Sequence, residues 1–118
     1  MIVIPDQIGN IPVTAIGDRV FRKMDITNIT IPNNIKQIGD EAFADNKITS
    51  LTIGNVNSIG TRAFANNQLT NLTIGDNVTI EFSAFADNRL TSVSIGENAY
   101  VGGNCTIYRQ WRESCYNS

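Results

Sequence analysis

Hydrophobic and polar positions repeat along this chain with a period of 21 or 22 residues. The stretch IGDEAFADNKITSLTIGNVN, which begins at Ile38, returns as IGTRAFANNQLTNLTIGDNV from Ile59 and as IEFSAFADNRLTSVSIGENA from Ile80. A looser copy, IGDRVFRKMDITNITIPNNI, begins at Ile16. A unit of this length cannot bury its apolar side alone, so the copies must stack on one another. The pattern therefore predicts a repeat solenoid.

Inward-facing positions are expected wherever the same type of apolar residue recurs in the same phase. Five columns meet this condition: Phe21, Phe43, Phe64 and Phe85; Ile26, Ile48, Leu69 and Leu90; Ile29, Leu51, Leu72 and Val93; Ile31, Ile53, Ile74 and Ile95; and Ile16, Ile38, Ile59 and Ile80. Stacking the copies would place like residues on one another, so we expect a core made of side-chain ladders. The extra residue of the first copy falls between two columns, in a turn.

Each copy contains two kinds of local pattern. Leu51, Thr52 and Ile53 alternate between apolar and polar, as in a strand with one buried face, and Asn or Gly ends the run on either side. The segment EAFADN surrounds Phe43 with small alanines, which favours a short helical or 3₁₀ turn. Each coil of 21–22 residues is therefore predicted to carry one short strand and one short helical or 3₁₀ turn.

An asparagine column follows the phenylalanines at Asn46, Asn67 and Asn88. A buried amide can satisfy backbone groups where the chain turns, and identical amides can bond from coil to coil. We interpret this column as structural. The first copy has Met24 at this position, which predicts an irregular turn there.

Taken together, the copies follow the consensus I-G-x-x-A-F-x-x-N-x-L-T-x-L-T-I-(P/G), which resembles the leucine-rich repeats of BspA type found in bacterial and protist surface proteins. The resemblance covers about residues 2–101. It implies a right-handed leucine-rich-repeat solenoid, an extracellular or cell-surface location, and adhesion to host matrix proteins or other cells.

The chain divides where the repeat stops. Residues 1–15 lead into the array and cap it, four coils follow from residue 16, and the solenoid extends to residue 101. Segment 102–118 differs sharply in composition, and we interpret it as a C-terminal cap or the start of another module. Its candidate binding patch is Tyr108, Arg109, Trp111 and Arg112. Cys105 and Cys115 are a candidate disulfide, with free thiols or pairing outside this chain as the alternatives.

Composition excludes several classes of protein. Of the 118 residues, 42 % are hydrophobic and 17 % charged, which rules out a disordered chain, and a net charge of −2 gives no electrostatic basis for binding nucleic acid or an anionic membrane. No apolar run approaches the length of a membrane span. The absence of histidine removes the commonest general base and metal ligand. We expect no enzyme activity and no cofactor.

The start of the chain carries no signal peptide. Met1 is followed directly by a strand-like IVI, which suggests a fragment of a longer secreted protein; a naturally short intracellular chain is the alternative.

Charged residues are expected on outward turns. Asp40, Asp45 and Asp87 are interpreted as solvated. Opposite charges in successive coils, such as Arg19 and Glu41, are expected to pair along the stack with little effect on stability.

The candidate binding surface is the outer face of the predicted strands. It comprises Asn28, Thr30, Ser50, Thr52, Asn71, Thr73, Ser92 and Ser94. A structural interpretation is that Thr simply suits exposed strand positions. We expect a non-enzymatic protein-interaction module of an adhesin-like bacterial surface protein, with a host matrix or cell-surface protein as partner. The alternatives are a spacer with no ligand and ice binding through the Thr/Ser lattice. The chain is expected to be mostly monomeric, with weak self-association through its N-terminal end.

Overall fold

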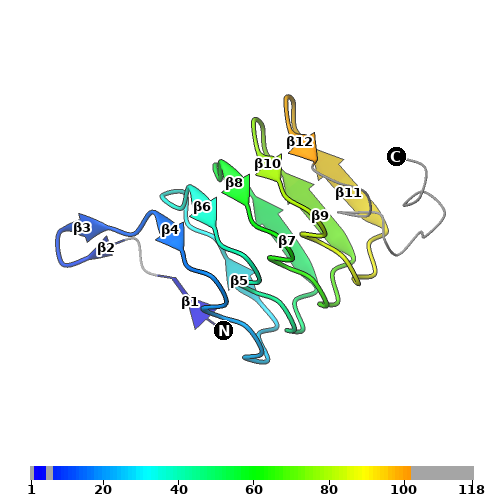
Figure 1. The fold of residues 1–118 in the computed structure, drawn as a ribbon, viewed down its shortest axis with the longest axis horizontal. Coiled ribbons are helices and arrows are strands. Elements are labelled where there is room, and N and C mark those ends of the chain that lie inside the picture. Colours follow the sequence, from blue (N-terminus) through cyan, green and yellow to red (C-terminus); the bar gives the residue numbers. More distant parts are fainter. Residues whose placement is uncertain (1, 5–6, 102–118) are drawn as a thin grey trace.

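The structure is a computed structural model that describes residues 2–4 and 7–101, and these residues wind into a solenoid of parallel strands (Figure 1). Coil 1 comprises residues 16–37, coil 2 residues 38–58, coil 3 residues 59–79 and coil 4 residues 80–101. Each coil runs along three walls around the core: a wide sheet, a narrow sheet, and a turn wall that carries the phenylalanine. The predicted repeat solenoid is confirmed.

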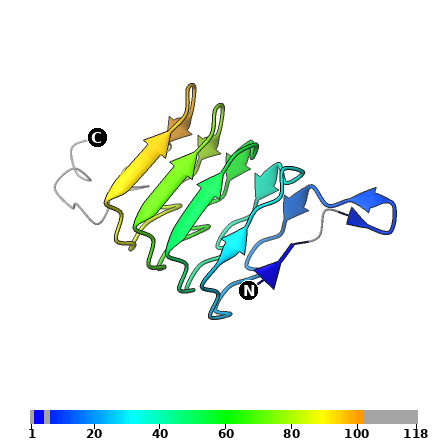
Figure 2. The same ribbon diagram turned by 180° about the vertical axis from the view of Figure 1, so that it is seen from behind.

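The wide sheet consists of β7 (Ser50–Ile53), β9 (Asn71–Ile74) and β11 (Ser92–Ile95). Adjacent strands are parallel and in register, with Leu51 beside Leu72 and Leu72 beside Val93. Next to β7 lies β5 (Ile29–Thr30), which pairs on its other side with β1 (Ile2–Val3) (Figure 2). In β7 and β9 residues alternate between exposed and buried, as the period-2 pattern predicted.

The narrow sheet was not predicted. It consists of β4 (Ala15–Ile16), β6 (Gln37–Ile38), β8 (Ser58–Ile59), β10 (Thr79–Ile80) and β12 (Tyr100–Val101), all parallel. Each coil therefore carries two strands, and the prediction of one was wrong. Two residues are too few to show an alternating pattern, because a period of two becomes visible only over about four to eight residues.

No helix occurs in the part of the chain that the structure describes, so the predicted helical or 3₁₀ turn is also wrong. The turn wall comprises residues 17–24, 39–46, 60–67 and 81–88. Two residues of each coil here have a positive φ, such as Glu41 (56°) and Asp45 (60°), whereas helices need a negative one.

Hydrogen bonding between coils explains this backbone. The amides of Glu41, Phe43 and Asp45 donate to carbonyls of coil 3 at 2.9, 2.7 and 3.0 Å. A helix would have turned these amides along their own segment and left the neighbouring coil unpaired. The two left-handed residues of a turn wall cost about 1–2 kcal/mol each, and three bonds of about 0.5–1.5 kcal/mol each are of comparable size.

Phenylalanine rings form the predicted ladder. Successive centroids from Phe21 to Phe85 lie 5.2, 5.0 and 5.5 Å apart, with interplanar angles of 13° or less. Phe43, Phe64 and Phe85 are fully buried, whereas Phe21 is only partly buried. Among the described residues, Phe21 and Phe85 each stack on one ring only, so the ring ladder alone does not decide how far a phenylalanine is buried.

The asparagine column is structural, as predicted. Asn67 Oδ1 accepts from the Ile48 amide at 3.1 Å, and its Nδ2 donates to the carbonyls of Phe43 and Phe64, both at 3.0 Å. In these bonds each amide joins its own turn to the preceding coil through the backbone, rather than through another amide. At Met24 the turn is irregular, since Asp25 adds a third positive φ (55°) that the other turn walls lack.

Glycines let the coils approach closely. A Cβ on Gly60 would lie 2.5 Å from Asp40 Oδ1 and 2.7 Å from the Asp40 amide, and Gly39 meets Asp18 in the same way. The Asp40 carboxylate lies there because its Oδ1 accepts the Thr61 amide at 2.9 Å. Coil 4 has Glu81 at the glycine position, where the preceding coil carries Thr61 in place of an aspartate. The nearby bond from the Arg62 amide to the Phe82 carbonyl is 3.2 Å long, whereas the equivalent bonds from the Arg19 and Glu41 amides are both 2.9 Å long.

The N-terminal residues form a small separate element. β2 (Gln7–Ile8) and β3 (Ile11–Pro12) pair antiparallel, with Gly9 at φ +63° in the turn. This hairpin projects beyond the first coil (Figure 1).

Candidate functional site

The predicted surface forms one exposed face of the solenoid. All eight of its side chains are exposed: Asn28, Thr30, Ser50, Thr52, Asn71, Thr73, Ser92 and Ser94. We call this set the polar lattice. Strand pairing aligns Ser50, Asn71 and Ser92 in one row and Thr52, Thr73 and Ser94 in another, while Asn28 and Thr30 continue the face onto coil 1. The lattice contains hydroxyl and amide groups and no charge.

A further threonine column, which the sequence interpretation missed, borders the lattice. Thr49, Thr70 and Thr91 precede the strands, and their hydroxyls link the coils: Thr70 Oγ1 donates to the Thr49 carbonyl at 3.3 Å and Thr91 Oγ1 to the Thr70 carbonyl at 3.2 Å. The column is visible in the sequence as a Thr two residues before Leu51, Leu72 and Val93. The hydroxyls of Thr70 and Thr91 are therefore already engaged by the backbone.

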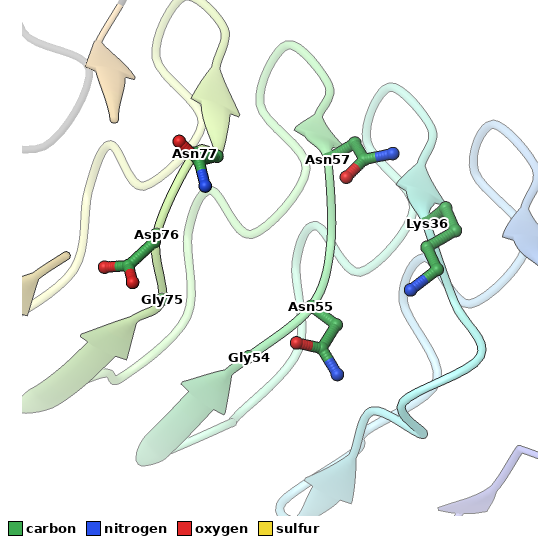
Figure 3. Close-up of a pocket in the computed structure, with 7 residues that line it drawn as sticks. All are labelled: Lys36, Gly54, Asn55, Asn57, Gly75, Asp76 and Asn77. Carbon is green, nitrogen blue, oxygen red and sulfur yellow. The ribbon is translucent and has the colours of Figure 1, made fainter. Parts of the chain in front are cut away.

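A polar cleft of about 590 Å³ lies at the other border, where the wide sheet turns toward the narrow one. It is lined by Lys36, Gly54, Asn55, Asn57, Gly75, Asp76 and Asn77. Figure 3 shows that Lys36 and Asn57 project from neighbouring coils toward the same space, whereas Asp76 points away from them. Gly75 is required here, because a Cβ would collide with the carbonyl oxygen of Gly54.

The two loops that line the cleft bury their valines at different positions. Val56 is buried three residues after Ile53, whereas Val78 is buried four residues after Ile74. Both loops place four residues between the wide-sheet strand and the narrow-sheet strand, so the inward valine is shifted by one position in loops of equal length. The shift is visible in the sequence, but the cleft between the stacked coils is not.

Hydrogen-bonding groups dominate the cleft. Three asparagines supply both donors and acceptors, Lys36 supplies a cation, and Asp76 Oδ1 is already engaged by the Glu97 amide at 2.8 Å. Lys36 Nζ makes one weak contact, donating to the Asn33 carbonyl at 3.4 Å. Such a site recognises a polar group by hydrogen bonds rather than by burial of apolar surface.

Asp45 on the turn wall is not simply solvated, contrary to the prediction. Asn66 Nδ2 donates to its Oδ1 and Arg22 Nε to its Oδ2, both at 2.8 Å. The bond from Asn66, followed by that from Arg22, holds the pKa of Asp45 below its ordinary value. Pairing along the stack is confirmed for Arg19 and Glu41, 3.6 Å apart. These contacts join neighbouring coils.

Chemistry beyond binding has little support in the described residues. Among residues 2–4 and 7–101, no group of three or more acidic, cysteine or histidine side chains lies close enough to hold a metal ion. No buried side-chain nitrogen or oxygen in this part lacks a hydrogen-bond partner. No helix among the same residues is long and apolar enough to cross a membrane. The described arrangement offers surfaces for recognition.

Predictions for the tail lie outside the described residues. They concern the candidate patch and the candidate disulfide, namely Tyr108, Arg109, Trp111, Arg112, Cys105 and Cys115. Both stay predictions.

The family model of the BspA type leucine rich repeat region matches residues 2–110 in six copies. Searches of curated proteins and of solved structures give no match. The matched region spans nearly the whole chain and includes every coil described above. The chain belongs to the BspA-type leucine-rich repeat family.

Proposed function

We propose that this chain is a non-enzymatic protein-interaction module that binds its partner through the polar lattice. The observation that carries the proposal is that eight uncharged side chains from four successive coils are all exposed and, over three strands, held in register. A rigid sheet fixes these groups before binding, which lowers the entropy cost of association.

The chemistry of the lattice suits a protein partner. Interface centres are depleted in charged residues, and Ser and Asn side chains supply adaptable hydrogen bonds. The lattice itself lacks the aromatic and Arg anchors that dominate binding energies, so the partner would contribute them. A partner's polar or charged side chain would enter the cleft beside Lys36 and Asn57.

Family membership supports a surface location. BspA-type repeats are typical of bacterial surface and secreted proteins, which favours an adhesin-like role with a host matrix or cell-surface protein as partner. We infer that the chain acts outside the cell. In this setting Cys105 and Cys115 would be oxidised.

Binding to matrix tests the proposal. The probe is the extracellular matrix laid down by cultured fibroblasts, and the readout is the amount of labelled protein retained. Thr52→Arg/Thr73→Arg places two bulky charges at the centre of the lattice, and we expect at least about a tenfold loss of affinity. The matched control is Gln37→Arg/Ser58→Arg, which places two arginines on adjacent narrow-sheet strands. Equal loss in both variants would refute the lattice as the site.

The tail patch is the competing location. Trp111→Ala/Arg112→Ala in the same assay separates the two, because a lattice site predicts unchanged retention. If neither double variant nor the parent chain is retained, the spacer alternative replaces the interaction module.

One observation favours ice binding as a second candidate. Thr52, Thr73 and Ser94 lie in one in-register row, with neighbouring strands spaced about 4.8 Å apart. A regular array of hydroxyls could order water. Thermal hysteresis in a solution of the intact chain would support this activity, and freezing at the equilibrium point would exclude it.

A further inference from the structure

The two junctions on either side of coil 3 differ at the loop between the wide and narrow sheets. Between coils 3 and 4, the Glu97 amide donates to Asp76 Oδ1 and the Asn77 amide donates to the Glu97 carbonyl, both at 2.8 Å. Asn55 and Val56 hold the equivalent positions between coils 2 and 3, and neither bond forms there within the described part of the chain. Val56 is buried, whereas Asn77 is exposed. The polar cleft is therefore a place where the hydrogen bonding between coils is interrupted.

This interruption leaves several hydrogen-bonding groups open to solvent. The backbone amide of Asp76 donates no hydrogen bond within residues 2–4 and 7–101. Within the same residues, no bond is made by the side-chain amides of three exposed residues that line the cleft, Asn55, Asn57 and Asn77. Each of these side chains both donates and accepts, as a hydroxyl group does. A ligand with several hydroxyl groups can therefore pair with all of them.

The centre of the cleft carries a positive charge. Lys36 Nζ makes no ion pair with a described residue, and its hydrogen bond to the Asn33 carbonyl is 3.4 Å long. The Asp76 side chain points away from Lys36 and Asn57 (Figure 3), and its Oδ1 is engaged. An ammonium group beside amide donors suits an anion that accepts hydrogen bonds, such as a carboxylate.

The lining of the cleft does not suit an apolar ligand or a simple acidic side chain. Its described walls consist of Lys36, Asp76, three asparagines and two glycines, so a lipid or an aromatic group finds no apolar side chain to pack against. A glutamate carboxylate only accepts hydrogen bonds. It would pair with Lys36 but would leave the carbonyl oxygens of the asparagines without a donor. A ligand that fits every group carries both a carboxylate and hydroxyls.

We propose that the cleft binds an acidic sugar that belongs to a glycan attached to a side chain of the protein partner. The carboxylate accepts from Lys36 Nζ and from an asparagine amide, and the hydroxyls pair with the remaining amides. A uronic acid carries both groups on one ring. The cleft, at about 590 Å³, falls within the range of about 300–1,000 Å³ that is usual for small-molecule sites. The inference rests on the proposed function, because it names the group of the partner that enters the cleft beside the lattice.

A free oligosaccharide tests the cleft without any matrix. The probe is a tetrasaccharide of alternating glucuronic acid and N-acetylglucosamine, whose only charges are carboxylates. Binding is followed by the amide NMR signals of the intact labelled chain, and we expect saturable shifts centred on residues 33–36, 54–57 and 75–77. The carboxyl-reduced tetrasaccharide should bind at least about tenfold more weakly. Equal binding of the two sugars would refute recognition of the carboxylate.

Two variants with matched controls locate the contacts. Lys36→Gln removes the charge and should abolish the preference for the acidic tetrasaccharide over the reduced one. Lys47→Gln is its control and should keep that preference, because Lys47 is also exposed and does not line the cleft. Asn57→Leu should weaken the binding of both sugars by about tenfold or more, whereas Asn71→Leu on the lattice should change neither. Equal effects of a variant and its control would overturn the site.

An acidic peptide is the alternative occupant. The capped tripeptide Gly-Glu-Gly supplies a carboxylate without hydroxyls, and it should bind at least about tenfold more weakly than the tetrasaccharide. Binding of the tripeptide with equal affinity would assign the cleft to an acidic side chain and overturn the inference. No saturable binding of the tetrasaccharide at millimolar concentration would also overturn it.

Failure of this inference can be distinguished from failure of the proposed function. Thr52→Ala/Thr73→Ala alters the lattice without changing its charge and should leave tetrasaccharide binding unchanged. On fibroblast matrix, excess tetrasaccharide should lower the retention of the intact chain, and unchanged retention would refute a glycan on the partner. Loss of retention in Thr52→Arg/Thr73→Arg, combined with no tetrasaccharide binding by the parent chain, would overturn the inference and leave the lattice as the site.

Discussion

Coils 1 and 3 share one sequence pattern but differ in what surrounds them. Coil 3 lies between two coils, and its Phe64 is fully buried, with Asn67 bonded to the preceding coil and to its own turn. Coil 1 has a full coil on one side only, and its Phe21 is partly buried while Val20 and Met24 are about half exposed. The comparison shows that stability in this fold is shared between neighbours rather than contained within a coil.

Phenylalanine substitutions should give the largest contrast. Phe64→Ala should reduce the free energy of unfolding by about 3–5 kcal/mol, against a total typically near 5–15 kcal/mol. Phe21→Ala should cost about half as much, because Phe21 is only partly buried. Urea titration measures both. Thr73→Ala on the exposed lattice should cost under about 1 kcal/mol, and a loss as large as that of Phe64→Ala would mean that inside and outside have been misassigned.

The asparagine column should show the next largest difference. Asn67→Ala removes the acceptor of the buried Ile48 amide and a donor to two carbonyls, so we expect a loss of about 2–3 kcal/mol. Met24→Ala at the equivalent position of coil 1 should change stability by less than about 0.5 kcal/mol, since Met24 is 51 % exposed. Similar losses in thermal unfolding of the two variants would contradict the structural role of the amide.

Glycine substitutions test whether a glycine is needed because neighbouring coils approach closely or only because it lies in a turn. Gly60→Ala brings a Cβ against Asp40 and should cost about 1–3 kcal/mol. Gly54→Ala meets nothing within 4 Å and should be neutral or stabilising by up to about 1 kcal/mol. Chemical denaturation of both variants checks this, and equal costs would show that stacking distance does not set the requirement for glycine.

The smallest expected effect concerns Asp45. Its pKa is lower in the folded chain than its ordinary unfolded value of 3.8. The carboxylate therefore stabilises the fold above that pH, and the contribution is lost as pH falls through the folded pKa. Asp45→Asn should lower stability at pH 7 and flatten the decline toward acid pH.

A control for Asp45 is Asp25→Asn. Asp25 is 86 % exposed and pairs with Lys47 at 3.5 Å. Thermal melts at pH 7 and pH 3 should show little change from the parent chain for this variant. A decline toward acid pH that is the same in Asp45→Asn and the parent would mean that the contacts with Asn66 and Arg22 do not persist in solution.

Much of this fold is determined by the sequence itself. Columns of Phe, Ile and Leu at a fixed period can be buried only by stacking, so the solenoid, the ring ladder and the exposed polar lattice follow from the pattern. The alternation of Leu51, Thr52 and Ile53 likewise determines which side of the wide sheet faces water, because a period of two leaves no other assignment.

Only the tertiary structure decided the turn wall, the narrow sheet and the cleft. Alanines around Phe43 favour a helical turn locally, but three hydrogen bonds to the next coil outweigh that preference and place Glu41 and Asp45 at positive φ. The cleft is lined by residues of three successive coils, so it exists only once the coils are stacked. These features are relations between coils, and no single copy of the repeat encodes them.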